Sequence, residues 1–107
     1  MRLPREKSKR MATAARCKDE VVCIKEMLSV LRGVECVYLH KENNRFSVVV
    51  VVAEKDYELE RRIFEIKLEV TDWFQESLFD FRVFVRRGRS LSEVVTPIGE
   101  LVFQKTA

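Results

Sequence analysis

The sequence predicts an α+β fold, a small mixed sheet of three to four strands with helices packed on it. Three observations lead to this class. Apolar residues recur at helical spacing in two segments, consecutive valines at 48–52 are typical of a strand covered on both faces, and apolar and polar residues alternate over 79–85. The expected element order is helix, strand, strand, helix, strand, short helix and a possible last strand.

The composition is that of one ordinary globular domain. The chain has 107 residues, 47% hydrophobic and 35% charged, which supplies enough apolar surface for a single core. Its longest apolar run, 48–53, is far shorter than the roughly 20 residues of a membrane-spanning helix. No long apolar segment follows the basic N-terminus, as a secretory signal would require. We therefore expect one α+β domain over residues 13–107, located in the cytoplasm and without a membrane partner.

The positive charge is concentrated at the N-terminus. Residues 1–18 hold seven basic and one acidic side chain, a net charge of +6, whereas the whole chain carries only +3 and the remainder is therefore at −3. Residues 1–12 also contain Pro4 and few large apolar side chains, so they are predicted to form a flexible basic arm. The overall charge is thus no evidence for a nucleic-acid-binding face on the folded domain.

The first helix is predicted to begin at Asp19 and to end with Gly33 as its left-handed C-cap. Strands are predicted over 34–40 and 45–53. The polar turn between them contains Asn43 and Asn44, which tolerate positive φ, so the two strands should form a hairpin. The apolar face of the helix is formed by Val21, Ile24, Leu28 and Leu31.

A long second helix is predicted after Asp56, which is a suitable N-cap. Its apolar residues recur at steps of four and three, as one face of a helix requires; they are Leu59, Ile63, Ile66, Val70 and Trp73. The opposite face is interpreted as a solvated ladder of charges, formed by Glu58, Arg61, Arg62 and Glu65.

The third strand is predicted over residues 79–85, with one face covered, because apolar and polar side chains alternate along it. Ser90 is predicted to cap a short helix over 91–95. Residues 101–103 follow Pro97 and Gly99 and form a possible edge strand.

Few side chains are available for catalysis or metal binding. With only three glycines, the chain has no Gly-rich phosphate loop. The three cysteines lack a CxxC spacing and His40 is the single histidine, so neither a disulfide, a structural zinc nor a histidine-activated nucleophile is expected. Asp80 lies in a strand beside Arg82, but metal-assisted phosphoryl transfer needs two or three such carboxylates. We therefore assign no catalytic residue, metal or cofactor.

Four segments follow one another in an order that resembles a known fold. They are 34–39, the valine strand with its continuation to 56, the helix over 59–73, and the closing segment 98–103. This order and texture, over residues 22–103, is similar to that of the small nucleotidyltransferase-fold domains. In those domains a Gly-Ser pair after the first strand holds the nucleotide phosphates, and an Asp-x-Asp pair opening the second strand binds the metals.

The chain departs from that family at the positions that carry the chemistry. Residues 40–44 replace the Gly-Ser loop, and Arg45 and Ser47 stand where the two aspartates would fall. Only Asp80 remains as a counterpart of the family's third carboxylate. The resemblance therefore implies an inactive member in which Arg45, Ser47 and Asp80 mark a vestigial site, and the chain is not expected to be an enzyme.

Three functions of different classes remain open. The first is a non-catalytic nucleotidyltransferase-like domain that acts through protein–protein interaction, with itself or with another protein, and whose interface would include Trp73 and Phe84. The second is nucleic-acid binding, in which basic side chains give salt-dependent phosphate contacts. The third is a divergent nucleotidyltransferase. The basic residues of the second hypothesis are Arg2, Arg5, Lys7, Lys9, Arg10, Arg86, Arg87 and Arg89.

Overall fold

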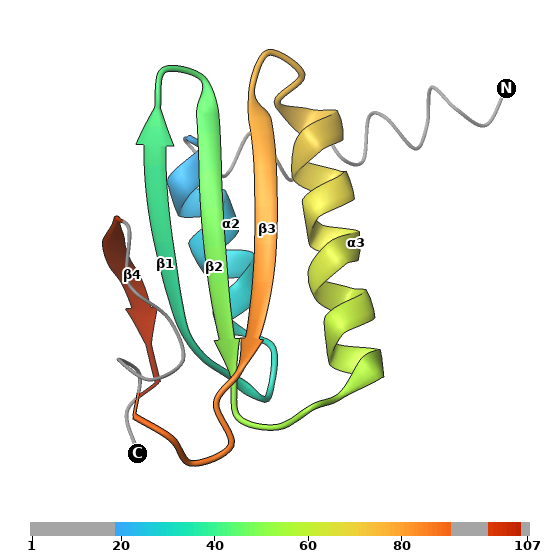
Figure 1. Cartoon of the computed structure of the whole chain (residues 1–107). Helices are drawn as coiled ribbons and strands as arrows, with labels where there is room; N and C mark the ends of the chain where they lie inside the picture. Colours follow the sequence, from blue (N-terminus) through green and yellow to red (C-terminus); the bar gives the residue numbers. More distant parts are fainter. Residues whose placement is uncertain (1–18, 91–98, 106–107) are drawn as a thin grey trace, which may run out of the picture.

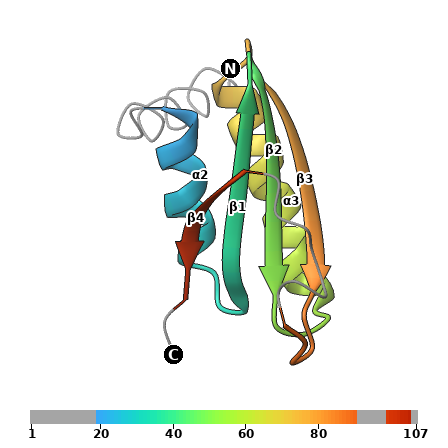
Figure 2. The same ribbon diagram turned by 60° about the vertical axis from the view of Figure 1, so that its left-hand side comes forward.

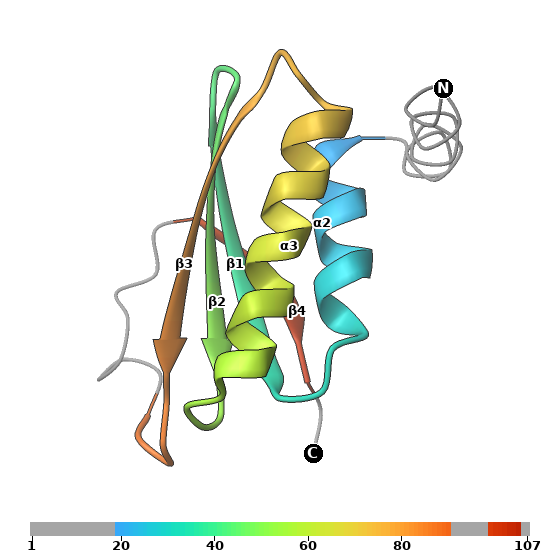
Figure 3. The same ribbon diagram turned by 90° about the vertical axis from the view of Figure 1, so that its right-hand side faces the viewer.

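The computed structural model of the chain describes residues 19–90 and 99–105. Four strands form one mixed sheet in the order β3-β2-β1-β4, and two helices lie side by side on one face of it (Figures 1 and 3). The predicted α+β class and mixed sheet are confirmed. The elements are α2 (Glu20–Ser29), β1 (Val34–Glu42), β2 (Arg45–Val52), α3 (Tyr57–Trp73), β3 (Leu78–Val85) and β4 (Glu100–Gln104).

Two predicted features fall outside this part of the chain. The basic arm at 1–12 and the short helix at 91–95 lie among residues that the structure does not describe. The beginning of the predicted domain at residue 13 lies outside it as well.

The strand pairings place β2 inside the sheet. β1 and β2 form the predicted antiparallel hairpin, whose turn includes Asn43 at φ 58°. β3 runs parallel to β2 after the α3 crossover, and β4 pairs antiparallel with β1 at the other edge (Figure 2). Since β2 has a hydrogen-bonded neighbour on each side, the valine run is a central strand, as predicted.

Both helices begin at the aspartates that the sequence indicates. The Asp19 carboxylate accepts a hydrogen bond from the backbone N–H of Val22 at 2.9 Å, and Asp56 accepts one from that of Leu59 at 3.1 Å. Each bond satisfies an N–H that has no partner within its own helix.

The predicted end of the first helix is wrong. α2 ends at Ser29 with Val30 as its C-cap, and Gly33 lies in the turn beyond it at φ 96°. A Cβ at Gly33 would lie 2.7 Å from the Leu59 side chain of α3. Gly33 therefore serves the close approach of this turn to α3, and its positive φ does not mark the helix end.

The main core lies between the sheet and the two helices. At one end Phe46 of β2 stacks on Phe79 of β3, with ring centroids 5.3 Å apart. A second, smaller cluster lies on the other face of the sheet, where Val51 is buried. The valine strand is thus covered on both faces, as predicted. The main core includes Ile24, Leu28, Val37, Val48, Val50, Ile63 and Val70, and the second cluster comprises Cys36, Tyr38 and Val51 with Val49 and Phe84 packed against them.

The length and hydropathy of the described helices were compared with those of a membrane-spanning helix. Neither α2 nor α3 is both long enough and apolar enough to cross a bilayer.

Candidate functional site

The predicted vestigial site lies on the sheet face turned away from the helices. Ser47 stands opposite Asp80 on β3 and opposite His40 on β1. Arg45 is exposed at the start of β2, on the same face, because alternate residues of a strand share a face. The structure therefore brings the three predicted positions together on one surface.

The chemistry of this surface is limited. The Asp80 carboxylate lies 3.3 Å from the Arg82 Nε, and both side chains are more than half exposed. Asp80 thus points to open surface and not into a cleft. No three histidine, cysteine, aspartate or glutamate side chains of the described segments come together as metal ligands. A single exposed carboxylate beside a guanidinium offers a divalent cation little of the oxygen coordination that it requires.

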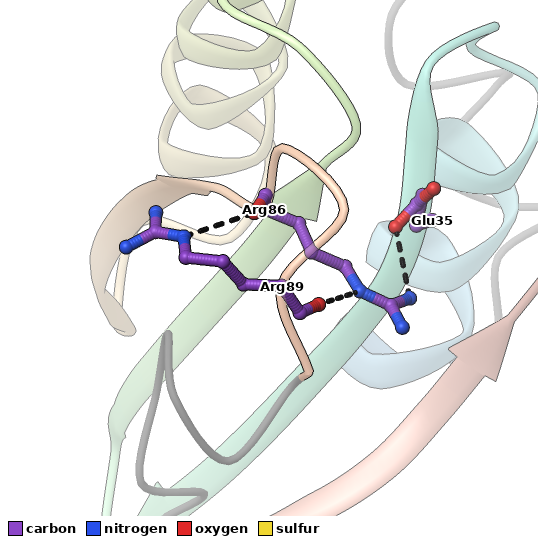
Figure 4. A network of polar contacts seen from close by, with 3 residues as sticks. All are labelled: Glu35, Arg86 and Arg89. Atoms are coloured by element: carbon purple, nitrogen blue, oxygen red, sulfur yellow. Dashed lines mark hydrogen bonds and ion pairs between the residues drawn. The ribbon is translucent and has the colours of Figure 1, made fainter.

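The arginine cluster after β3 makes internal contacts. Arg86 reaches across the end of β2 to β1, where its Nη1 lies 3.2 Å from Glu35 Oε1 (Figure 4). The Arg86 Nε donates to the carbonyl oxygen of Arg89. In return, the Arg89 guanidinium donates to the carbonyl oxygens of Arg86 at 3.1 Å and Val85 at 2.8 Å. Two of the three arginines therefore hold this loop together.

These contacts bear on the nucleic-acid hypothesis. Arg87 is exposed at φ 51°, and its side chain makes no hydrogen bond or ion pair with the residues that the structure describes. A phosphate would have to compete for Arg86 and Arg89 with their existing acceptors. The five basic residues predicted in the arm lie outside the described segments.

Cys36 lies close to this network, in the second cluster. Burial raises the pKa of its thiol, the negative charge of Glu35 adds to the increase, and the positive charge of Arg86 opposes it. Burial also raises the pKa of Tyr38. Both groups are held in their neutral forms, so neither has the lowered pKa of an activated nucleophile.

The raised thiol pKa predicts a pH-dependent contribution to stability. The unfolded chain loses the Cys36 proton near the ordinary pKa of 9.0, before the folded chain does. Above that pH the unfolded state binds fewer protons, so the free energy of unfolding falls as pH rises, by at most about 1.4 kcal/mol per pH unit for this group. Urea unfolding of the Cys36→Ala variant should show a smaller fall above pH 9 than the natural chain.

The control for this prediction is the range in which the thiol does not titrate. Between pH 7 and 8 the difference in stability between the two chains should stay constant. Parallel curves from pH 7 to pH 10 would contradict a contribution from Cys36.

The two residues predicted to mark an interface are largely occupied inside the fold. Trp73 packs against the main core, and its Nε1 is buried without a hydrogen-bond partner in the described structure. Phe84 packs against the second cluster. Neither belongs to the large apolar side chains that are mainly exposed.

Three of the six large apolar side chains that are exposed in the described segments lie on the outside of α3; the other three are Val30, Leu78 and Leu101. Tyr57, Phe64 and Leu68 are 78%, 39% and 67% exposed. Their spacing of seven and four places them on one side of the helix, and we call them the outer stripe. The outer stripe was missed in the sequence analysis, because charged residues on the same face led to its interpretation as a solvated surface. The seven-and-four spacing of the three apolar residues is the signal that could have revealed it.

A second apolar feature lies on another side of α3, where it meets α2. The groove between the helices exposes Val30, at 76%, close to Met27 and Leu31. On the α3 side of the groove, Ile66 is the one apolar lining residue and its neighbours in the lining are charged, so the groove offers little apolar surface. The charged residues that line it are Arg62, Glu65 and Glu69.

Comparison with known proteins identifies no relative. No protein-family model matches the sequence, no curated protein matches it, and no solved structure matches the fold.

Proposed function

We propose that this chain is a non-catalytic domain of nucleotidyltransferase-like architecture that acts by binding a protein surface. The observation that carries the proposal is the outer stripe. Its three large apolar side chains lie on the side of α3 that a solvated surface helix fills with polar residues. Contiguous exposed apolar side chains on an otherwise polar surface are typical of interaction sites.

The non-catalytic part of the proposal is supported by the surface around β2. Arg45 and Ser47 occupy the positions at which the family that the sequence resembles carries metal-binding aspartates. Asp80 is paired with Arg82. Cys36 and Tyr38 are buried and held neutral, so the second cluster contributes packing and supplies no reactive group.

Cross-linking from the stripe tests this function directly. A photoreactive benzoylphenylalanine replaces Phe64 in the full chain, which is expressed in its native cells and irradiated. We expect one discrete adduct band, because a partner that covers the stripe lies within reach of the side chain. Mass spectrometry of the band then gives the identity of the cross-linked protein.

The matched control places the same photoreactive residue at Val30, which is similarly exposed but lies at the groove between the helices. This position should give no such band. If residues 57, 64 and 68 all fail to produce a discrete adduct, the interaction function is wrong.

A further inference from the structure

Unlike charges flank the outer stripe on both sides, and their order along α3 differs between the two sides. Glu60 and Lys67 are seven residues apart, close to two helical turns, and lie along one margin of the stripe. Arg61 and Glu65 are one turn apart and lie along the other margin. The two pairs therefore carry their negative and positive charges in opposite order along the helix. Asp72, seven residues after Glu65, adds a second negative charge to that margin near the end of α3.

The charged groups beside the stripe differ in exposure. Arg61 and Glu65 are exposed, and Arg61 also pairs with Glu58, whereas Glu60 and Lys67 are half-buried. Glu60 pairs with Lys55 at 2.9 Å, while Lys67 forms no ion pair with the described residues. Figure 1 shows that α3 is the outermost described element on the side away from α2, so a second molecule can approach the stripe without displacing another element.

We propose, on the basis of the interaction function above, that the partner of the outer stripe is a second copy of this chain. The two α3 helices pack antiparallel about a two-fold axis beside Phe64. In this arrangement each Glu60 lies opposite Lys67 of the second copy, and each Arg61 lies near Glu65 of the second copy. The two Phe64 rings meet at the axis, and each Tyr57 lies near Leu68 of the other copy.

The charges on both margins are compatible with a second copy of the same helix. The antiparallel arrangement pairs unlike charges along each margin and is self-complementary, as an isologous two-fold interface requires. A parallel pair would bring opposite margins together, with Glu60 beside Arg61 and Lys67 beside Glu65 of the second copy, and the charge-reversed mixture described below would then not recover. One helix face from each copy gives an interface near the small end of the known range, so the dimer should be in equilibrium with the monomer.

Sedimentation velocity on the full chain, over about 10 μM to about 1 mM, measures this equilibrium. We expect a reversible monomer–dimer transition for the natural sequence. Glu60→Lys and Lys67→Glu should each weaken the dimer at least about tenfold, because each places like charges opposite one another twice. An equimolar mixture of the two variants should restore the dimer, because the antiparallel pairing then brings unlike charges together at both positions.

Exposed apolar residues provide the second pair of variants. Leu68→Gln should abolish the dimer, whereas Val30→Gln, at a comparably exposed position outside the stripe, should leave it unchanged. Circular dichroism checks that each variant keeps its helices, and any variant that fails this check is replaced by the other variant at the same interface.

Three results would overturn the proposal: a natural chain that stays monomeric to about 1 mM, a dimer that none of the stripe variants weakens, or a charge-reversed mixture that does not recover. A cross-link from position 64 to a different protein would also overturn self-pairing, yet it would leave the interaction function standing. The two proposals therefore fail by different observations.

Discussion

Replacing Phe46 with alanine is expected to lower the free energy of unfolding by about 3–5 kcal/mol. The ring is 1% exposed in the main core and stacks on Phe79 at 5.3 Å. Its removal loses both the apolar burial and the aromatic contact, and β2 has strands on both sides that cannot close the cavity. The free energy of unfolding of a small domain is about 5–15 kcal/mol in total, so this loss is a large fraction of it. Urea unfolding should therefore show a midpoint at a clearly lower urea concentration.

The matched control is Phe64→Ala on the outer side of α3. Phe64 is 39% exposed and lies outside the core clusters, and alanine has the higher helix propensity. We expect a change within about 1 kcal/mol, measured on dilute protein so that association does not contribute. Equal losses for Phe46→Ala and Phe64→Ala would contradict the assignment of Phe46 to the core.

Replacing Val51 with aspartate is expected to prevent folding or to cost more than about 4 kcal/mol. Val51 is fully buried on the face of the sheet that carries no described helix, between Cys36 and Tyr38. Arg86, the cation whose charge acts on Cys36, is already paired with Glu35, so a new carboxylate would be buried without a free cation or would stay protonated. Thermal unfolding followed by circular dichroism measures the loss.

Val49→Asp is the control on the same strand and the same face. Val49 is only partly buried, so its carboxylate keeps contact with water and the expected cost is smaller. A Val51→Asp chain as stable as the Val49→Asp chain would show that this face is open, and the valine strand would then have one core instead of two.

The two stability predictions and the proposed interface concern different sides of the molecule. The main core fixes α3 through Leu59, Ile63 and Val70, while Phe64 and Leu68 point to the other side of the same helix. Substitutions in the outer stripe should therefore change association without unfolding the chain. This separation is what makes the interface experiments interpretable.

Several features follow from the sequence by itself, because local chemistry decides them. Asp19 and Asp56 cap helices since their carboxylates satisfy free backbone N–H groups, whatever the rest of the fold does. The turn at Asn43 tolerates positive φ. Five consecutive valines must point to both faces of a strand, so a central position for β2 was predictable from the sequence.

Other features were decided only by tertiary contacts. The end of α2 at Ser29 was not predicted, because Gly33 was taken as the C-cap of the helix. Glycine is required at position 33 for another reason: the side chain of Leu59, on another helix, leaves no room there for a Cβ. The use of Arg86 to reach Glu35 depends on strands that are distant in sequence. No local rule specifies which arginine of a cluster finds an acceptor inside the fold.

The candidate site divides in the same way. The sequence by itself determined that the start of the valine strand has no carboxylate pair, because Arg45 and Ser47 can be identified there without knowledge of the fold. Only the tertiary structure decided that Trp73 and Phe84 pack inward while Tyr57 and Leu68 remain exposed. The physical reason is that exposure depends on which side of a helix or strand faces the core, and contacts distant in sequence set that orientation.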